Sequence, residues 1–262
     1  MRSALRQSVR VHVEGSGPAL VLLHGWGMNA AVWRDLSAAL APDFCVHAVE
    51  MPAFGCGDFE SVDTTSTAII DALAAALPAR LTVCGWSLGG QLALAWAQRY
   101  PDQVARLILL GATPRFVCND SWAHGMADET FESFAADVVA SVPRARMRFL
   151  TLQANGDHAA REVLRELREA HARGGEAGGK ALAAGLALLR EMDLRADLAQ
   201  IAQPALVMHG VNDALIPQAA GEFLAQALAQ AEFESMAGAG HALFLTREAQ
   251  VAKRIREFHG RH

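Results

Sequence analysis

The stretch VCGWSLGGQLAL, from Val83 to Leu94, decides how the rest of the sequence is interpreted. An apolar run leads into Ser87, which has one glycine two residues before it and another two residues after it, and a helix-like pattern follows. This spacing is typical of a nucleophile elbow, in which a sharp turn between a strand and a helix raises a serine hydroxyl above a sheet. The alternative is a serine in an ordinary glycine-rich turn. The stretch therefore predicts a catalytic serine whose partners must be found elsewhere in the chain.

Apolar runs and helical patterns alternate along the first part of the chain, and strand signals return near its end. An edge strand is expected at 9–15, and buried strands are expected at 19–25, 44–52, 80–86, 104–112 and 204–210. Helical patterns lie between the earlier strands, at 29–42, 64–77 and 87–99. Strict alternation of this kind is typical of a mostly parallel, doubly wound α/β sheet.

Between residues 113 and 190 the sequence shows helical patterns only, at 129–140, 144–153, 159–172 and 180–190. Because a strand signal returns at 204–210, the simplest account is a helical lid inserted between two strands of the sheet. The sequence therefore divides into a first core segment at 1–112, a lid at 113–190 and a second core segment at 191–262.

The composition limits the class of protein. Of 262 residues, 52% are hydrophobic and 19% are charged, which fits a globular protein rather than a disordered one. A formal net charge of -5 does not favour binding to nucleic acid or to an anionic membrane. No apolar stretch is long enough to span a bilayer, and because the first residues lack a long apolar run we expect no signal peptide. We therefore expect a cytoplasmic protein, and a monomer.

The cysteines give no sign of a disulfide framework or a metal site. Cys45, Cys56, Cys84 and Cys118 show no CxxC spacing, and a chain of this length needs no disulfides to fold. Cys84 lies near Ser87 but falls inside a predicted strand, which indicates a buried and inert thiol. No phosphate-binding loop competes with the serine, so we expect neither a metal nor a cofactor.

A serine hydroxyl becomes a good nucleophile only when a base takes its proton and a carboxylate orients that base. Asp213 follows the last of the predicted buried strands, and His241 lies in the later glycine-rich stretch GAGHALF. The order serine, aspartate, histidine is the one expected for this fold. The alternatives are a turn-forming aspartate and a surface loop histidine. Asp193 and Asp197 are the other candidate acids, and His209, inside the strand, is expected to be structural.

The reaction also needs N–H donors for the negative charge of its tetrahedral intermediate. The backbone N–H of Leu88 stands at the positive end of the helix after the serine and is the first candidate. The second is the backbone N–H of Trp26, in the loop after LVLLHG. The indole of Trp26 is then expected to be free to wall an acyl pocket, while His24 braces the loop by hydrogen bonding.

The stretches LLHGWGMNAAVW, GWSLGG, RFLTLQ, LLREMDLR and AGHALF together resemble the pimeloyl-acyl-carrier-protein methyl ester esterases of biotin synthesis, the BioH type. The similarity runs nearly end to end and includes the lid. It implies an α/β-hydrolase fold, catalytic Ser87, Asp213 and His241, and removal of a methyl group from a chain carried by acyl carrier protein. It also implies a set of substrate contacts, at Trp26, Ser87, Leu88, Phe149, Leu150, Thr151, Leu152, Gln153 and His241.

The chain departs from the family pattern at VEMPAFG. The family tends to have an aspartate and a Pro-Gly pair there, where this chain has Glu50 and Ala53. Because this segment is away from the strands that carry the three catalytic residues, we expect tuning of the activity rather than its loss.

Arginines gather in the lid of a chain whose net charge is negative. Arg144 and Arg148 share one helix face, and Arg161, Arg165 and Arg168 share another. One interpretation is a solvated helix face with ion pairs to glutamates on the same helix. The other is a docking surface for an acidic partner. The resemblance favours the second for Arg144, Arg148, Arg161 and Arg165, because the family places such arginines against the carrier protein.

The sequence thus predicts a serine carboxylesterase that hydrolyses the methyl ester of pimeloyl-acyl carrier protein, releasing methanol. Two alternatives keep the catalytic residues and change the substrate: a general short-chain carboxylesterase and a lid-bearing C–C bond hydrolase. A third alternative is a ligand-binding receptor on the same fold, which is not an enzyme. In the lid, Phe149, Leu150 and Leu152 are expected either to wall a channel for a seven-carbon chain or to pack the lid on the core.

Overall fold

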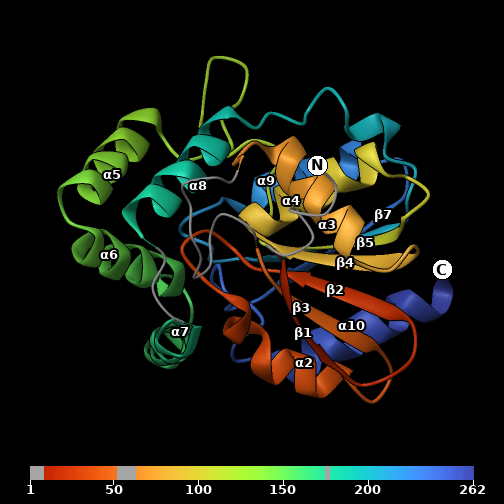
Figure 1. Ribbon diagram of the computed structural model, residues 1–262. Coiled ribbons are helices and arrows are strands. Elements are labelled where there is room, and N and C mark those ends of the chain that lie inside the picture. Colours follow the sequence, from red (N-terminus) through yellow and green to blue (C-terminus); the bar gives the residue numbers. More distant parts are fainter. Residues whose placement is uncertain (1–8, 52–62, 175–177) are drawn as a thin grey trace.

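The computed structural model describes residues 9–51, 63–174 and 178–262. Its centre is a seven-stranded sheet of order β1-β3-β2-β4-β5-β6-β7, parallel throughout except between β1 and β3 (Figure 1). The strands are β1 (Arg10–Glu14), β2 (Ala19–Leu23), β3 (Cys45–Glu50), β4 (Leu81–Trp86), β5 (Val104–Leu110), β6 (Ala205–Gly210) and β7 (Ala231–Met236). The predicted, mostly parallel α/β sheet is confirmed.

Side chains of the inner strands alternate between two cores, because successive residues of a strand point to opposite faces of the sheet. In β2, Val21 and Leu23 face one core while Leu20 and Leu22 face the other, and all four are fully buried. Helices cover both faces (Figure 1), with α3 (Ser66–Ala76), α4 (Leu88–Arg99) and α9 (Gln218–Ala227) on the first and α2 (Arg34–Leu40) and α10 (Glu248–Arg261) on the second. Burial on both faces explains why these strands are continuous apolar runs.

The single helix expected over 29–42 is divided. It begins as a 3₁₀ turn, η1 (Ala30–Trp33), and continues as α2. The side-chain oxygen of Asn29 accepts the N–H of Ala31 at 3.0 Å and so caps the first turn. The turn ends at Trp33, which is fully buried and stacks on Phe244 with ring centroids 4.4 Å apart. The second core thus fixes the point at which the 3₁₀ turn gives way to the α-helix.

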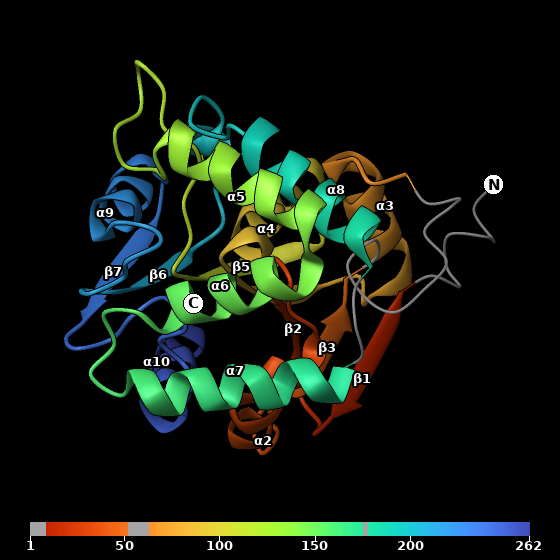
Figure 2. The same ribbon diagram turned by 90° about the vertical axis from the view of Figure 1, so that its left-hand side faces the viewer.

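Four helices form the lid between β5 and β6, namely α5 (Asp128–Ala140), α6 (Val142–Ala154), α7 (Ala160–Gly174) and α8 (Gly179–Glu191). They lie side by side (Figure 2): α5 contacts α6 and α8, α6 contacts α7, and α7 rests on η1. A short turn, η3 (Leu198–Gln200), leads back to the sheet. Because Phe149 and Leu182 of the lid share a core with Leu88 of α4, the lid is packed continuously on the sheet. The division of the chain at residues 112 and 190 stays a prediction.

Cys84 is fully buried in β4, and burial raises the pKa of its thiol, as expected for an inert cysteine. Cys45 and Cys118 are free thiols, and Cys56 lies outside the described residues. Across the parts of the chain that the structure describes, no helix is long and apolar enough to cross a membrane, and no cluster of ligating side chains could hold a metal ion.

Candidate active site

Ser87 occupies a strained turn between β4 and α4. Its φ of 57° and ψ of -119° make it the one non-glycine residue with positive φ in 9–51, 63–174 and 178–262. The flanking glycines permit the turn: a Cβ on Gly85 would lie 2.6 Å from the Gly90 nitrogen, and one on Gly89 would lie 2.8 Å from the His24 oxygen. Strain of this kind persists only where the surroundings enforce it and is typical of active sites. The turn therefore has the geometry expected of a nucleophile elbow.

The structure brings Asp213 and His241 together. Asp213 follows β6 and His241 follows β7, and His241 Nδ1 lies 2.8 Å from Asp213 Oδ2 with both side chains fully buried. The other carboxylate oxygen, Oδ1, accepts the N–H groups of Leu215 and Ile216 at 2.8 and 2.9 Å. Burial alone would raise the pKa of Asp213, but the charge of the adjacent imidazoles of His241 and His209 and their hydrogen bonds to the carboxylate hold it well below its usual range. The carboxylate is therefore ionised and oriented, as a triad acid must be.

His241 lies beside the elbow. The indole N–H of Trp86, the residue immediately before Ser87, donates to the His241 carbonyl oxygen at 3.1 Å, and the two rings lie 5.5 Å apart. Nδ1 donates to the ionised Asp213, which leaves Nε2 as the basic nitrogen of the neutral ring. Among the described residues, Nε2 is buried and has no hydrogen-bond partner. The arrangement leaves a base available to the serine while its other nitrogen is held.

The loop after β2 also reaches the elbow: a Cβ on Gly25 would lie 3.3 Å from the Ser87 Cβ. His24 braces this loop, because its Nε2 accepts the N–H of Met51 at 3.3 Å and its Nδ1 donates to the Gly25 oxygen at 2.9 Å. The bond from Met51 requires a neutral ring, because Nε2 can accept only when it carries no proton, and burial lowers the pKa of His24 to about 4. The bracing role predicted for His24 agrees with these contacts.

The indole of Trp26 contacts the lid. Its N–H donates to the Leu182 oxygen of α8 at 2.9 Å. Its ring packs edge-on against Phe149 and Phe134, with centroid distances of 4.6 and 5.2 Å. A buried N–H needs an acceptor, and the lid supplies one. Trp26 therefore joins the loop beside the elbow to three lid helices. The expectation that this indole walls an acyl pocket stays a prediction.

The residues of the FLTLQ stretch face different environments. Phe149 and half-buried Leu152 lie toward the core that contains Trp26, and Gln153 is buried. Leu150 packs into the core on the other face of the sheet, and exposed Thr151 donates its hydroxyl to the Met147 oxygen of its own helix. One face of a helix cannot present all five side chains to one pocket. Substrate contact therefore stays a prediction for the whole stretch, and the packing supports it least for Leu150 and Thr151.

The five lid arginines that the sequence singles out divide into two groups. Arg165 forms ion pairs within its own helix, with Glu162, Glu166 and Glu169, and Arg148 pairs with Asp137 of α5. These two arginines fit the interpretation of a solvated, paired helix face. Three other arginines are exposed and have no ion pair among the described residues: Arg144, Arg161 and Arg168. Of these five, the second group offers charge that no described carboxylate neutralises.

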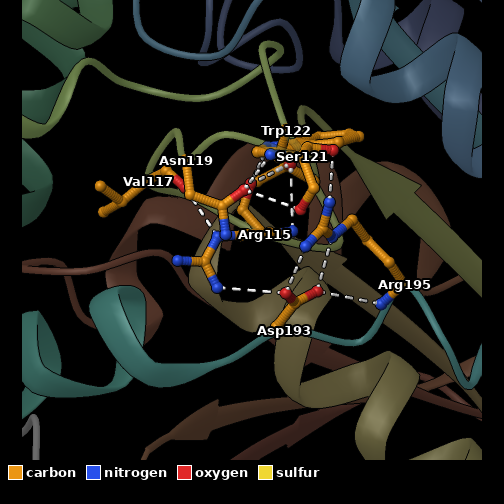
Figure 3. A network of polar contacts seen from close by, with 8 residues as sticks. Arg115, Val117, Asn119, Ser121, Trp122, Asp193 and Arg195 are labelled. Carbon is orange, nitrogen blue, oxygen red and sulfur yellow. Dashed lines mark hydrogen bonds and ion pairs between the residues drawn. The ribbon is translucent and has the colours of Figure 1, made fainter.

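The two other candidate acids are not brought to His241. Asp193 lies in a separate network, with Arg195 donating to it at 2.7 and 2.8 Å and Arg115 at 3.1 Å (Figure 3). The hydrogen bonds from Arg195 lower the pKa of Asp193 to about 2, against the effect of burial. Asp197 stands at the start of η3. Asp193 therefore ties the segment after β5 to the segment after α8.

His209 is closer to the acid than its predicted structural role implies. Its Nε2 lies 2.9 Å from the Ile216 oxygen and 3.3 Å from Asp213 Oδ2, and the ring is fully buried. It therefore helps to position the carboxylate that holds His241. The sequence placed His209 at the end of β6, but no spacing rule connected it with Asp213, four residues on.

Glu50 ends β3 beneath η1. Its Oε1 accepts the N–H of Ala30 at 3.1 Å, and partial burial raises the pKa of the carboxyl. The contact supports the start of η1 and lies away from Asp213 and His241. The other departure from the family pattern, Ala53, falls outside the described residues.

A family model for the alpha/beta hydrolase fold matches residues 18–248 of the chain. The chain belongs to the alpha/beta hydrolase family. This hydrolase is 38% identical over 239 residues to the pimeloyl-acyl-carrier-protein methyl ester esterase of Nitrosomonas europaea, which aligns 91% of this chain with 94% of the relative. It is 40% identical over 253 residues to the same esterase of Xanthomonas campestris pv. campestris, with 95% and 98% aligned. The resemblance inferred from the motifs is confirmed.

Solved structures share the fold of this hydrolase. An esterase from Exiguobacterium antarcticum matches it with a TM-score of 0.86 at 24% identity, over 95% of this chain and 94% of that one. The enol-lactonase from Burkholderia xenovorans LB400 matches with a TM-score of 0.82, also at 24% identity, over 95% of each chain. These likenesses confirm the architecture of the sheet and its helices.

Proposed function

We propose that this hydrolase cleaves the methyl ester of pimeloyl-acyl carrier protein, giving pimeloyl-acyl carrier protein and methanol in biotin synthesis. The observation that carries the chemistry is the buried hydrogen bond between His241 and Asp213, next to the strained elbow at Ser87. The observation that carries the substrate is 38–40% identity, nearly end to end, to relatives named for this ester.

In the proposed mechanism, Ser87 Oγ attacks the ester carbonyl carbon while His241 Nε2 takes the hydroxyl proton. The backbone N–H groups of Leu88 and Trp26 bind the oxygen that becomes negative. Leu88 is the first residue of α4, so its N–H has no partner within the helix. The tetrahedral intermediate collapses, the C–O bond to the methoxy group breaks, and His241 returns the proton to release methanol.

The second half repeats these roles with water. His241 removes a proton from a water molecule, and the resulting hydroxide attacks the acyl-serine carbonyl. Collapse breaks the bond to Ser87 Oγ, which recovers its proton from His241. Asp213 stays ionised throughout, in agreement with the lowered pKa of its carboxyl, and stabilises the imidazolium in both halves.

We place the acyl chain against the lid. Trp26 and Phe149 join the loop after β2 to α6, so a chain leaving the carbonyl beside Ser87 meets apolar surface there. The packing also excludes water, which strengthens hydrogen bonds to the developing oxyanion. Exposed Arg144 and Arg161 would receive the acidic carrier protein, whereas Arg148 and Arg165 must first give up or share their carboxylate partners.

Two measurements test the proposal in sequence. A fluorophosphonate should label Ser87 in the wild type and leave Ser87→Ala unlabelled, because only an activated serine reacts. Wild-type protein without label would support the receptor alternative. Methanol release from the carrier-bound methyl ester then tests the substrate. Hydrolysis of p-nitrophenyl esters without any methanol release would reduce the protein to a general carboxylesterase.

A further inference from the structure

The loop that joins α6 to α7 (Figure 2) lies against both loops that carry the triad partners. Its central residue is Asp157, whose carboxylate is 1% exposed. This carboxylate accepts the N–H of Gly240, the residue immediately before His241, at 2.8 Å, and the N–H of Ala159 at 2.8 Å. Arg247 completes the set, with Nη1 at 2.9 Å from Oδ2 and Nη2 at 3.3 Å from Oδ1.

Arg247 and the lid loop hold the same turn from two directions. Nη2 of Arg247 also donates to the Gly238 oxygen at 2.9 Å, and that oxygen accepts the N–H of His158 at 2.9 Å. On the side of the acid, the N–H of Asn212 donates to the Ala239 oxygen at 3.0 Å. The turn at 238–240 is therefore fastened to the lid, to Arg247 and to the residue before Asp213.

The close packing leaves the lid loop little freedom to shift. Gly156 has a φ of 83°, and a Cβ there would overlap the Asn212 oxygen. A Cβ on Gly240 would lie 3.1 Å from the Asn155 oxygen. Burial by itself would raise the pKa of Asp157, but Arg247 and the two N–H donors hold it below its usual value. The buried charge is thus paired and fully bonded, which is the condition for such a group to be stable.

We propose that Asp157, ion-paired with Arg247, is a positioning residue that sets the place of the His241 imidazole and makes it depend on how the lid is seated. The inference rests on the proposed role of His241 as the base. Through Gly240 the carboxylate fixes the backbone one residue before the imidazole, so a displaced lid loop displaces the ring. A misplacement of about 1 Å in a catalytic group costs on the order of a hundredfold in rate.

The test compares Asp157→Asn, Arg247→Met and the double variant with the wild type. A suitable ester is p-nitrophenyl acetate, which is too small to need the carrier protein or a long acyl pocket. We expect kcat to fall about tenfold or more in each single variant with little change in KM, and the double variant to be no worse than the singles. The rate at which a fluorophosphonate labels Ser87 should fall in parallel.

Asp193→Asn is the matched control. This substitution also removes a carboxylate charge, here one that accepts hydrogen bonds from Arg115 and Arg195 and so joins two distant segments (Figure 3). Asp193 has no contact with the turn at 238–240 among the hydrogen bonds of the described residues. We expect it to lower the melting temperature with kcat unchanged. Arg247→Lys keeps one charged donor and is the variant to use if the others do not fold; its kcat should lie between those of the wild type and Arg247→Met.

The outcomes separate the inference from the proposed function. A wild type that a fluorophosphonate does not label would refute the role of the triad itself. A labelled wild type, with Asp157→Asn and Arg247→Met losing only thermal stability as Asp193→Asn does, would refute the positioning role. If Arg247→Lys is the one variant that folds, a rate of Ser87 labelling equal to that of the wild type would also refute the positioning role.

Discussion

His24 should make the stability of this hydrolase sensitive to acid, and the perturbation that isolates the effect is His24→Gln. The ring is fully buried, accepts the N–H of Met51 and donates to Gly25, so the fold requires it to be neutral. Burial lowers the pKa of His24 from 6.5 to about 4. A glutamine can still accept the N–H of Met51 but does not titrate.

The sign of the effect follows from proton linkage. Because the pKa is lower in the folded state, the unfolded chain takes up the proton first as the pH falls. The contribution of His24 is fully present above pH 6.5 and is lost progressively toward pH 4. At about 1.4 kcal/mol per pKa unit, the loss between pH 7.5 and 4.5 is roughly 3 kcal/mol.

Urea unfolding of the wild type and of His24→Gln at pH 7.5 and 4.5 measures this loss. Other groups titrate in both proteins, so the informative quantity is the difference between the two free energies of unfolding. We expect that difference to move by roughly 3 kcal/mol in favour of the variant on acidification. A difference that does not change with pH would refute the claim that a neutral His24 is required in the fold.

Three further predictions concern the site and the lid. Ser87→Ala should lower kcat by about 10⁴- to 10⁶-fold with the fold intact, measured by steady-state hydrolysis and circular dichroism; near-native turnover would refute the mechanism. Phe149→Ala should lower the free energy of unfolding by about 3–5 kcal/mol, measured by urea unfolding. It should also weaken the preference for a seven-carbon acyl chain, measured with p-nitrophenyl esters of graded chain length. An unchanged preference would show that Phe149 does not line the acyl site. Arg144→Glu with Arg161→Glu should lower kcat/KM about tenfold on the carrier-bound ester and leave dimethyl pimelate unaffected, whereas equal losses on both would point to damage in the lid.

Much of the fold could be predicted because its signals are local. Continuous apolar runs mark strands buried on both faces, and the glycines around Ser87 mark a turn that tolerates no side chains. Asp213 and His241 could be predicted because the order along the chain and the position after a strand are fixed by the fold. β7 is not among the strands expected from the sequence, since it lies at the edge of the sheet and most of its residues are only half-buried, so it forms no continuous apolar run.

The contacts that could not be predicted join residues far apart in the sequence. Helical spacing shows that Phe149 and Leu150 face different directions, but not that one meets Trp26 and the other the opposite core. The same limit applies to Asp157 and Arg247, which are 90 residues apart and have no motif in common. The pairing of Arg165 with three glutamates also depends on rotamers that sequence leaves open.

The proposed substrate is tested by single-turnover hydrolysis of pimeloyl-acyl carrier protein methyl ester, compared with hydrolysis of free dimethyl pimelate, each at low and high salt. We expect a strong preference for the carrier-bound ester that fades as salt screens Arg144 and Arg161 from the acidic partner. Equal rates on both esters that do not change with salt would contradict this expectation. The catalytic triad would stand, but the protein would be a general carboxylesterase whose exposed arginines do not bind a carrier protein.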